Sequence, residues 1–389
     1  MPPPATPNNR PLKFQFSWRS GNRFELLIDG PRFFPRMLEA IGAAQRSVLL
    51  EMYLIESGAV ATRFIEALAN AARRGVGVKL LLDDYGARGL AQNDRQRLHD
   101  AGVELAFYNP ISGTKLLGNI FRDHRKLLLV DDRVAFVGGA GIADEFDSPT
   151  HPAATWRETM LEIRGPVLAD WQALFLEAWN RHARVPATLP ALVPAVAGGG
   201  RGRVTSTRGL LTQEIKRSLL ARLRGARERV WLATAYFFPP WRVRRLLRRA
   251  ARRGVDVRLL LPGPVTDHPA ARHAGRYLYR RLLESGVRIF EYQPRFLHQK
   301  AVLCDNWVSI GSTNLDRWNL RWNLEANQEA ADAGLARATQ EMFERDFRDA
   351  IEYHLDEWQR RPWYARMLEY AWSMVAMWAE RLGRRKDVY

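Results

Sequence analysis

The chain alternates between short apolar runs and longer segments whose apolar residues recur at helical spacing. Two early apolar runs, SVLLEMYLI from Ser47 and RVWLATAYFF from Arg229, predict buried strands. Each follows a segment with helical periodicity, PRFFPRMLEAIGAAQ in one case and LLTQEIKRSLLARLRGA in the other. Strands that alternate with amphipathic helices indicate an α/β class, with sheets covered by helices on both faces.

The same succession of elements occurs twice. Two segments in which a predicted helix is followed by a predicted strand have similar sequences, ALANAARRGVGVKLLLDD and LLRRAARRGVDVRLLLPG. Gly75 and Gly254 follow these helices at a position where a residue without Cβ adopts the left-handed conformation at little cost. Another helix and strand follow in each half, LHDAGVELAFYNP and LLESGVRIFEYQP. The chain is therefore predicted to contain a duplicated α/β unit.

The segment PATLPALVPAVAGGGRGR is rich in Pro, Ala and Gly and has neither helical nor strand periodicity, which is typical of a linker. The predicted organisation is a disordered tail at 1–12, a first lobe at 13–185, a linker at 186–206, a second lobe at 207–355 and a C-terminal amphipathic helical segment at 356–389.

The halves differ just before their histidines. The first takes 124 − 110 = 14 residues from Pro110 to a histidine, and the second takes 298 − 294 = 4 from Pro294. The extra ISGTKLLGNIFRD is interpreted either as a substrate-facing loop or as an ordinary surface loop of variable length.

Composition narrows the class of protein. A chain of 389 residues with 47% hydrophobic residues can bury two cores of ordinary size. Its one cysteine, Cys304, excludes an internal disulfide framework, and its place in an apolar run predicts a small buried strand residue.

Charge and hydropathy bear on location and partners. The net charge of +17 attracts polyanions, either nucleic acid or an anionic membrane face. No apolar run reaches the length of a signal peptide or of a spanning helix. We therefore expect a cytoplasmic protein without a spanning helix.

One motif occurs in both halves: HRKLLLVD at 124–131 and HQKAVLCD at 298–305, each reading His-x-Lys-x4-Asp. Each is followed by a Gly-rich tetrad, GGAG from Gly138 and GSTN from Gly311. Residues two apart in a strand share a face, so His and Lys of each motif should project together. Two copies in matched surroundings indicate one bipartite active site.

These residue types suit chemistry at a phosphoryl group. Lysines and small polar residues stabilise charge on nonbridging oxygens. One histidine can attack phosphorus to form a phosphohistidine, and the other can protonate the leaving alkoxide and then deprotonate the acceptor. Carboxylates fix histidine tautomers in such sites, and the repeat suggests Glu158 and Glu325 for this. His124 and His298 lack companions at metal-ligand spacing, so no metal and no cofactor are expected.

The chain resembles the phospholipase D superfamily, whose signature is His-x-Lys-x4-Asp followed by Gly-Ser/Gly-x-Asn. The resemblance covers roughly residues 20 to 350. It is strongest to bacterial cardiolipin synthases of the type without N-terminal membrane spans. The segments that carry it are HRKLLLVDDRVAFVGG, the WRE…GP segment and GSTNLDRWNLRWNLEAN. It implies two similar α/β/α sandwich lobes related by a pseudo-twofold, with the active site at their interface and no metal.

The resemblance also implies roles for single residues. His124 would be the nucleophile and His298 the general acid and base. The catalytic set it implies is His124, Lys126, Asp131, His298, Lys300 and Asp305, and the phosphate-binding set is Gly139, Ser312 and Asn314. This chain departs from the signature at Gly141, where the family has Asn.

The C-terminal stretch RPWYARMLEYAWSMVAMWAERLGRRK has apolar residues at helical spacing: Tyr364, Leu368, Ala371, Trp372, Val375, Trp378 and Leu382. Two interpretations stay open. The helix could lie in a membrane interface with its aromatic residues as anchors, or it could pack on the second lobe as a terminal helix.

The resemblance thus implies transfer of a phosphatidyl group between two phosphatidylglycerol molecules, giving cardiolipin and glycerol, at the inner face of the cell membrane. The expected partners are anionic phospholipids, phosphatidylglycerol or phosphatidylethanolamine, and the membrane surface. The alternatives are a phosphodiesterase that hydrolyses phospholipid and, less favoured, a nuclease of the same superfamily. Nucleic acid is disfavoured because the basic residues are not interleaved with aromatic stacking residues.

Overall fold

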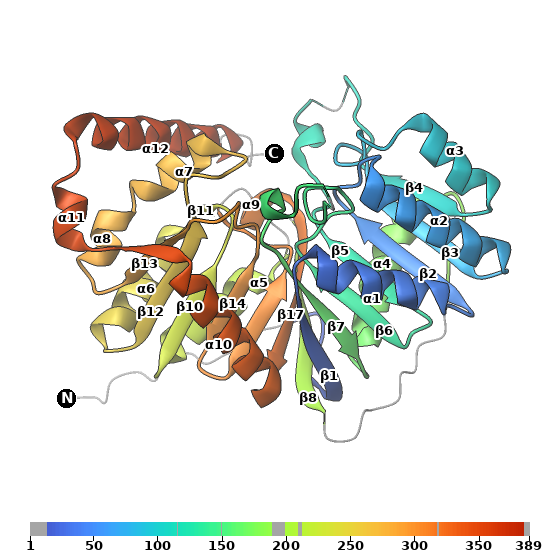
Figure 1. The fold of residues 1–389 in the computed structure, drawn as a ribbon, viewed down its shortest axis with the longest axis horizontal. Coiled ribbons are helices and arrows are strands. Elements are labelled where there is room, and N and C mark those ends of the chain that lie inside the picture. The colour runs from blue at the N-terminus through green and yellow to red at the C-terminus, as the bar shows by residue number, and fades with distance from the viewer. Residues whose placement is uncertain are drawn as a thin grey trace, which may run out of the picture.

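The computed structural model describes residues 14–114, 116–148, 150–188, 199–208, 212–316 and 319–384. The expected disordered tail at 1–12 lies outside these residues. Two α/β lobes stand side by side (Figure 1), which confirms the α/β class and the duplication. We call residues 19–182 the first lobe and residues 200–353 the second lobe.

The first lobe contains seven strands and four α-helices. Its strands are β1 (Arg19–Ile28), β2 (Ser47–Met52), β3 (Gly77–Asp83), β4 (Glu104–Tyr108), β5 (Lys126–Val130), β6 (Val134–Gly138) and β7 (Thr159–Arg164). Its α-helices are α1 (Gly30–Gly42), α2 (Ala59–Arg73), α3 (Gln92–Asp100) and α4 (Leu168–His182), and the short 3-10 helices are η1 (Leu116–Ile120) and η2 (Pro152–Ala154).

The second lobe repeats this plan with additions. Its strands are β8 (Gly200–Arg208), β9 (Thr212–Gln213), β10 (Arg229–Ala233), β11 (Phe237–Phe238), β12 (Asp256–Pro262), β13 (Arg288–Tyr292), β14 (Ala301–Cys304), β15 (Trp307–Gly311), β16 (Leu315–Asp316), β17 (Leu324–Ala331) and β18 (Ala350–Tyr353). Its helices are α5 (Glu214–Gly225), α6 (Trp241–Arg252), α7 (Pro269–Arg276), α8 (Tyr279–Leu283), α9 (Asn319–Trp322) and α10 (Ala333–Arg348), and α11 (Leu355–Gln359) and α12 (Trp363–Arg384) follow it.

The strand orders of the two lobes correspond, and their sheets join edge to edge. The first lobe runs β4-β3-β2-β5-β6-β7-β1 and the second runs β13-β12-β10-β14-β15-β17-β8, with β18 beyond β13. β1 and β8 pair antiparallel at the centre, so the strands form one continuous sheet. Equal strand orders that meet at equivalent edges are what a pseudo-twofold between the lobes produces.

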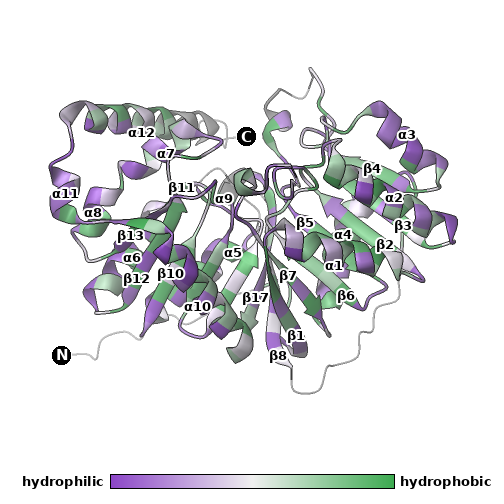
Figure 2. Ribbon diagram, viewed as in Figure 1, coloured by the Kyte–Doolittle hydropathy of each residue, from purple (hydrophilic) through white to green (hydrophobic). Residues whose placement is uncertain are grey.

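Side-chain alternation along the strands divides the core into layers. In β5, Leu127 and Leu129 face the core shared with α4, whereas Leu128 and Val130 face the core under α1 and α2. The α4 core continues across the lobe boundary to the residues under α10, where Trp171 donates a hydrogen bond of 2.8 Å to Gln328. Hydrophobic residues are concentrated along the strands in Figure 2.

The turns that end α2 and α6 are as predicted. Gly75 and Gly254 have φ values of +87° and +89°, the left-handed region that only residues without Cβ reach cheaply. These matched turns place β3 and β12 at equivalent positions in the two lobes.

Part of the expected linker is a strand. Residues 200–206 belong to β8, which pairs with β17 along its length. Its buried side chains include Thr205, Ser206 and Thr207 rather than a run of apolar residues. Periodicity in hydrophobicity therefore could not reveal a strand whose stability comes from two hydrogen-bonded neighbours.

Candidate active site

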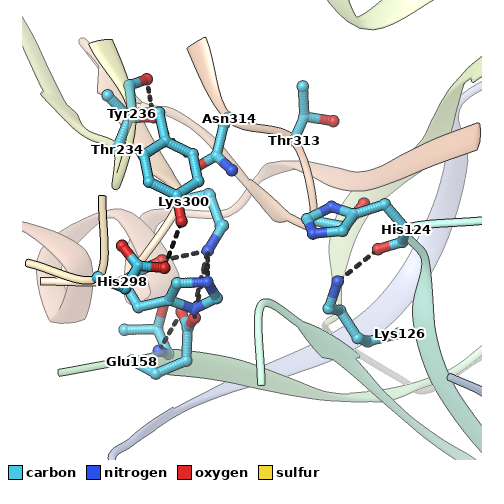
Figure 3. A network of polar contacts seen from close by, with 12 residues as sticks. His124, Lys126, Glu158, Thr234, Tyr236, His298, Lys300, Thr313 and Asn314 are labelled. Atoms are coloured by element: carbon cyan, nitrogen blue, oxygen red, sulfur yellow. Dashed lines mark hydrogen bonds and ion pairs between the residues drawn. The ribbon is translucent and has the colours of Figure 1, made fainter. Parts of the chain in front are cut away.

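The two His-x-Lys motifs lie at the same edge of the continuous sheet, where the lobes meet. Lys126 is the first residue of β5, and Lys300 immediately precedes β14. His124 therefore lies two residues before its strand and His298 three residues before its strand. Figure 3 shows His124 with Lys126 on one side of a shared space and His298 with Lys300 on the other. The fold thus brings both motifs into one site.

Short backbone bridges between the lobes hold each histidine. The His124 N–H donates to Leu324 O at 2.9 Å, and the Leu324 N–H donates to Arg122 O at 2.9 Å. The equivalent bonds at the other histidine run from His298 N–H to Arg157 O at 2.9 Å and from Arg157 N–H to Phe296 O at 2.8 Å. The pseudo-twofold is therefore repeated at the level of single hydrogen bonds.

This bridging pairs each histidine with a carboxylate from the opposite lobe. Glu325 follows Leu324 directly, and its carboxylate lies 3.1 Å from Nδ1 of His124. Glu158 follows Arg157, and its Oε2 lies 2.5 Å from Nδ1 of His298. Both glutamates are fully buried. A carboxylate at Nδ1 fixes the tautomer and leaves Nε2 for chemistry.

The lysines lie next to their own histidines. The Lys126 ammonium donates to His124 O at 2.7 Å and lies over the Tyr53 ring at 5.0 Å. The Lys300 ammonium lies 2.9 Å from Nε2 of His298 and 3.6 Å from Oε2 of Glu158. Two buried lysine side chains at one space supply N–H donors suited to the oxygens of a phosphodiester.

Burial and these charges shift the pKa values of the site. Burial lowers the pKa of His298 to about 3, helped by the positive charge of Lys300. The pKa of His124 is also lowered, chiefly by burial. Burial lowers the pKa of Lys126 to about 7 against the opposing effect of Glu325. Without substrate, both histidines are therefore neutral at pH 7, the form that can attack phosphorus.

The carboxylate beside His298 stays ionised in spite of its burial. Burial opposes the charge of Glu158, but Lys300 and His298 outweigh that effect and lower the pKa of Glu158. A phosphodiester beside His298 would add negative charge to the space and so raise the pKa of the imidazole. Substrate binding thereby favours the protonated form that a general acid requires.

The two aspartates of the motifs lie away from the histidines. The Asp131 carboxylate accepts hydrogen bonds from the backbone N–H groups of Gln45, Arg46 and Ser47 at 2.9, 2.7 and 2.9 Å. The Asp305 carboxylate binds the N–H groups of residues 227–229 in the same way. Both follow the far ends of β5 and β14, away from the histidines. They hold turns and do not touch the reacting groups.

The residues expected to bind phosphate have separate surroundings. Asn314 is buried, and its side chain points toward the space between the two His-Lys pairs in Figure 3. The Ser312 hydroxyl donates to the Glu325 carboxylate and accepts the Ala326 N–H at 3.1 Å, so it holds the glutamate beside His124. A Cβ on Gly139 would lie 2.3 Å from the Glu158 carboxylate, so this glycine makes room for the glutamate.

The departure at Gly141 has a steric reason. A Cβ there would lie 2.8 Å from Cβ of Leu54 and 2.9 Å from its carbonyl oxygen. The asparagine of the family signature therefore does not fit at this backbone position. Only the second lobe supplies a tetrad amide, that of Asn314, so the two halves of the site are chemically unequal.

The inserted segment before His124 is tied down at its base. Asn109 donates from its side-chain amide to Gly118 O at 2.8 Å and Phe121 O at 2.9 Å. The Phe121 ring packs edge-on against Trp322 of the second lobe at 5.6 Å. The segment thus reaches across the lobe boundary beside the site.

Aromatic residues that sequence reasoning missed surround both histidines. Trp156, Phe146 and Phe296 lie at ring-centroid distances of 5.0, 5.5 and 5.7 Å from His298. Tyr53 packs edge-on against His124 at 4.8 Å. Tyr236 lies near Lys300 in Figure 3, and its hydroxyl donates to Asp267 at 2.5 Å.

The repeat in the sequence could have identified the two tyrosines, Tyr53 and Tyr236, because they occupy equivalent positions. Tyr53 in EMYLI and Tyr236 in ATAYFF follow the corresponding strands of the repeat, β2 and β10. Burial raises the pKa of Tyr53 to about 12, and burial with Asp267 raises the pKa of Tyr236. Both phenols are therefore protonated hydrogen-bond donors at neutral pH.

Within the described residues, no three His, Cys, Asp or Glu side chains converge in a way that could hold a metal ion. Over the same part of the chain, none of the helices combines the length and the apolar character needed to cross a bilayer.

Comparison with known proteins identifies the family of the chain. The family model described as "Cardiolipin synthase, PLD-like domain" matches residues 37–174 and 219–347, one stretch in each lobe. Cardiolipin synthase A of Pseudomonas aeruginosa is 35% identical over 345 residues, covering 86% of this chain and 69% of the relative. Cardiolipin synthase B of Escherichia coli K12 is 36% identical over 326 residues, covering 80% and 77%.

Solved structures show the same fold at low sequence identity. Phosphatidylserine synthase from Haemophilus influenzae superposes with a TM-score of 0.71 at 15% identity, over 92% of this chain and 94% of that one. Polyphosphate kinase from Porphyromonas gingivalis gives a TM-score of 0.59 at 18% identity, over 86% of this chain and 49% of that one.

Proposed function

This chain belongs to the cardiolipin synthase family of phospholipase D-like proteins, and we propose that it transfers a phosphatidyl group from one phosphatidylglycerol to the hydroxyl of another. The products are cardiolipin and glycerol. The observation that carries the proposal is the pair of histidines, each with Nδ1 held by a buried glutamate of the opposite lobe and each beside a buried lysine.

In the first step, Nε2 of His124 attacks phosphorus and the bond from phosphorus to the glycerol oxygen breaks. His298, protonated in the presence of the anionic substrate, donates its proton to the departing oxygen, and glycerol leaves. Lys126, Lys300 and the Asn314 amide face the nonbridging oxygens, where charge develops. The products of this step are a phosphatidyl-His124 and a neutral His298.

In the second step, His298 removes the proton from a hydroxyl of the second phosphatidylglycerol, whose oxygen attacks phosphorus. The bond between phosphorus and His124 breaks, which releases cardiolipin and restores both imidazoles. The assignment of His124 as nucleophile is supported by its place in the first motif, where the family usually has it.

The surroundings of His298 favour an alcohol acceptor over water. Trp156, Phe146 and Phe296 form an apolar wall around the imidazole. Such a wall suits the approach of a lipid and limits the access of water to the intermediate. We propose that the enzyme works at a membrane surface, from which both lipids are drawn.

The test incubates the purified protein with phosphatidylglycerol vesicles and identifies the lipid products. We expect cardiolipin and glycerol in equal amounts from the native protein and none from His124→Ala. Phosphatidic acid as the only product would replace the transferase proposal with a hydrolase. A phosphorylated His298 in the His124→Ala variant would reverse the roles of the two histidines.

A further inference from the structure

Helix α12 packs on the second lobe with its polar side. Glu369 is 4% exposed and Ser373 is fully buried. The Glu369 carboxylate accepts hydrogen bonds from Arg276 of α7 at 3.1 Å and from Arg361 at 3.0 Å. An ion-paired carboxylate, rather than an apolar stripe, therefore fixes the helix in place.

The outward side of α12 is apolar. Its large exposed side chains, with exposed fractions from 37% to 66%, are Trp363, Tyr364, Met367, Leu368, Tyr370, Trp372, Met374 and Val375. The side chains of Trp378 and Leu382 lie outside the described residues. Ordinary surface helices bury their apolar side and expose their polar side. A contiguous apolar face of this size marks an interaction surface.

An arginine-lined groove of about 820 Å³ lies between α6 and residues 277–284. Seven arginines line it: Arg244, Arg245, Arg248, Arg249, Arg252, Arg280 and Arg281. Its one lining carboxylate, that of Glu284, binds Arg280 at 2.9 Å. Four of the arginines, Arg245, Arg249, Arg252 and Arg281, have no ion pair with any of the described residues.

The groove and the apolar face are continuous. Tyr277 lines the groove and packs against Tyr370 of α12 at a ring-centroid distance of 5.8 Å. Trp241, at the start of α6, also lines the groove and is 52% exposed. A cationic groove thus borders an apolar helix face, with aromatic side chains between them.

We propose that α12 and this groove form one docking surface for an anionic bilayer. The apolar side of α12 would enter the interfacial layer, where aromatic side chains anchor helices. The groove arginines would bind lipid phosphates, which match the donor geometry of guanidinium groups. The inference rests on the proposed function in one respect: the bilayer is taken to contain the substrate.

The position of α12 fits this use. Helix α12 packs on α7, which follows β12 in the chain. Near its carboxyl end β12 pairs with Ala233 of β10, and Ala233 in turn pairs with Ala301 of β14, the residue after Lys300. The carboxyl end of β12 therefore lies at the sheet edge that carries Lys300. Figure 1 shows α12 along the top of the second lobe and the segment that carries η1 rising at the top of the first. A bilayer on α12 would therefore lie at the sheet edge that carries the active site.

Two other occupants fit less well. An isologous dimer through α12 would place the same surface of both copies face to face and bring two arginine grooves together. Nucleic acid would neutralise the arginines but leave the apolar side of α12 in water. An anionic bilayer is the partner that matches both parts of the surface.

The experiment compares sedimentation of the full-length protein with phosphatidylcholine vesicles that contain or lack phosphatidylglycerol. The groove variant Arg245→Ala/Arg249→Ala/Arg252→Ala is paired with Arg337→Ala/Arg345→Ala/Arg348→Ala, which removes the same charge from α10. The helix variant Leu368→Ser/Val375→Ser is paired with Ile351→Ser, another exposed apolar position. Cardiolipin formation is measured on vesicles and on phosphatidylglycerol in detergent micelles.

We expect the native protein to bind only the anionic vesicles. Because each basic residue at an anionic surface contributes roughly fivefold to binding, the groove variant should bind at least about tenfold more weakly. The helix variant should also lose binding, and the two control variants should bind like the native protein. Both docking variants should keep their activity on micelles and lose it on vesicles.

Three results would overturn the docking proposal. The groove variant could bind vesicles as tightly as its α10 control, or the native protein could bind neutral and anionic vesicles equally. The third is that the helix variant loses a dimer that the native protein forms while its vesicle binding is unchanged. Binding of duplex DNA that is lost in the groove variant, without vesicle binding, would assign the groove to nucleic acid. Failure to make cardiolipin in any format would instead refute the proposed function, because vesicle binding is measured independently.

Discussion

Replacement of Glu158 by Gln tests the pairing of histidine and carboxylate between the lobes. The native carboxylate lies 2.5 Å from Nδ1 of His298, accepts the Thr159 N–H at 2.8 Å and lies 3.6 Å from the Lys300 ammonium. The substitution keeps the volume but removes the charge. It also puts an amide, which can act as a donor, where only an acceptor holds the required tautomer.

The structure gives the size of the effect. A buried hydrogen bond to a charged group contributes about 1.5–3 kcal/mol, and here it is strongest when His298 is protonated in the transition state. That range corresponds to a loss in kcat of about ten- to 150-fold. Displacement of the tautomer adds to it, so we expect kcat to fall by about 100-fold or more. KM should change little, because Glu158 touches His298 and not the lipid.

The assay combines steady-state cardiolipin formation with nitrogen-15 NMR of the labelled histidines. Glu162→Gln is the control: that carboxylate is also buried, in the strand β7 that directly follows Glu158, but it pairs with Arg36 at 2.7 Å, outside the site. We expect the resonances of His298 to shift in Glu158→Gln and those of His124 to stay. A kcat within about threefold of native, or a shift of His124 alone, would refute the pairing between the lobes.

Three further outcomes follow from the structure. Because the pKa of His298 is lowered to about 3, the unfolded chain binds more protons than the folded chain between pH 3 and about pH 6.5, and the free energy of unfolding falls as the pH drops through this window. In urea titrations, His298→Gln should reduce the fall in the free energy of unfolding between pH 7 and pH 5 by about 2 kcal/mol. The control His99→Gln, at an exposed position, should leave that fall unchanged. Asp131→Ala should lower the free energy of unfolding by about 3 kcal/mol, because the three hydrogen bonds that the carboxylate accepts from backbone N–H groups are lost, yet it should keep kcat. A large fall in kcat of the folded protein would indicate a catalytic role for Asp131. Burial raises the pKa of the Cys304 thiol to about 12, so the native protein should resist iodoacetamide at pH 8 and react in denaturant; equally fast alkylation of both would contradict the buried position.

The strands and helices that were predicted share a local cause. Buried strands such as 47–52 and 229–233, and the glycine turns at Gly75 and Gly254, are encoded by neighbouring residues through apolar runs and backbone preference. β8 was missed because its place is decided by the strands on either side of it. Pairing partners distant in sequence leave no periodicity in the strand itself.

The sequence by itself determined the duplication, the two His-x-Lys pairs and the identity of both glutamates, because a repeat makes equivalent positions visible. Only the tertiary structure decided that Glu158 serves His298 and Glu325 serves His124. It also turned the apolar side of α12 outward, because Glu369 pairs with arginines of the second lobe and takes the inner position. Both results depend on contacts between segments far apart in the chain, whose geometry is set by how the lobes and helices pack.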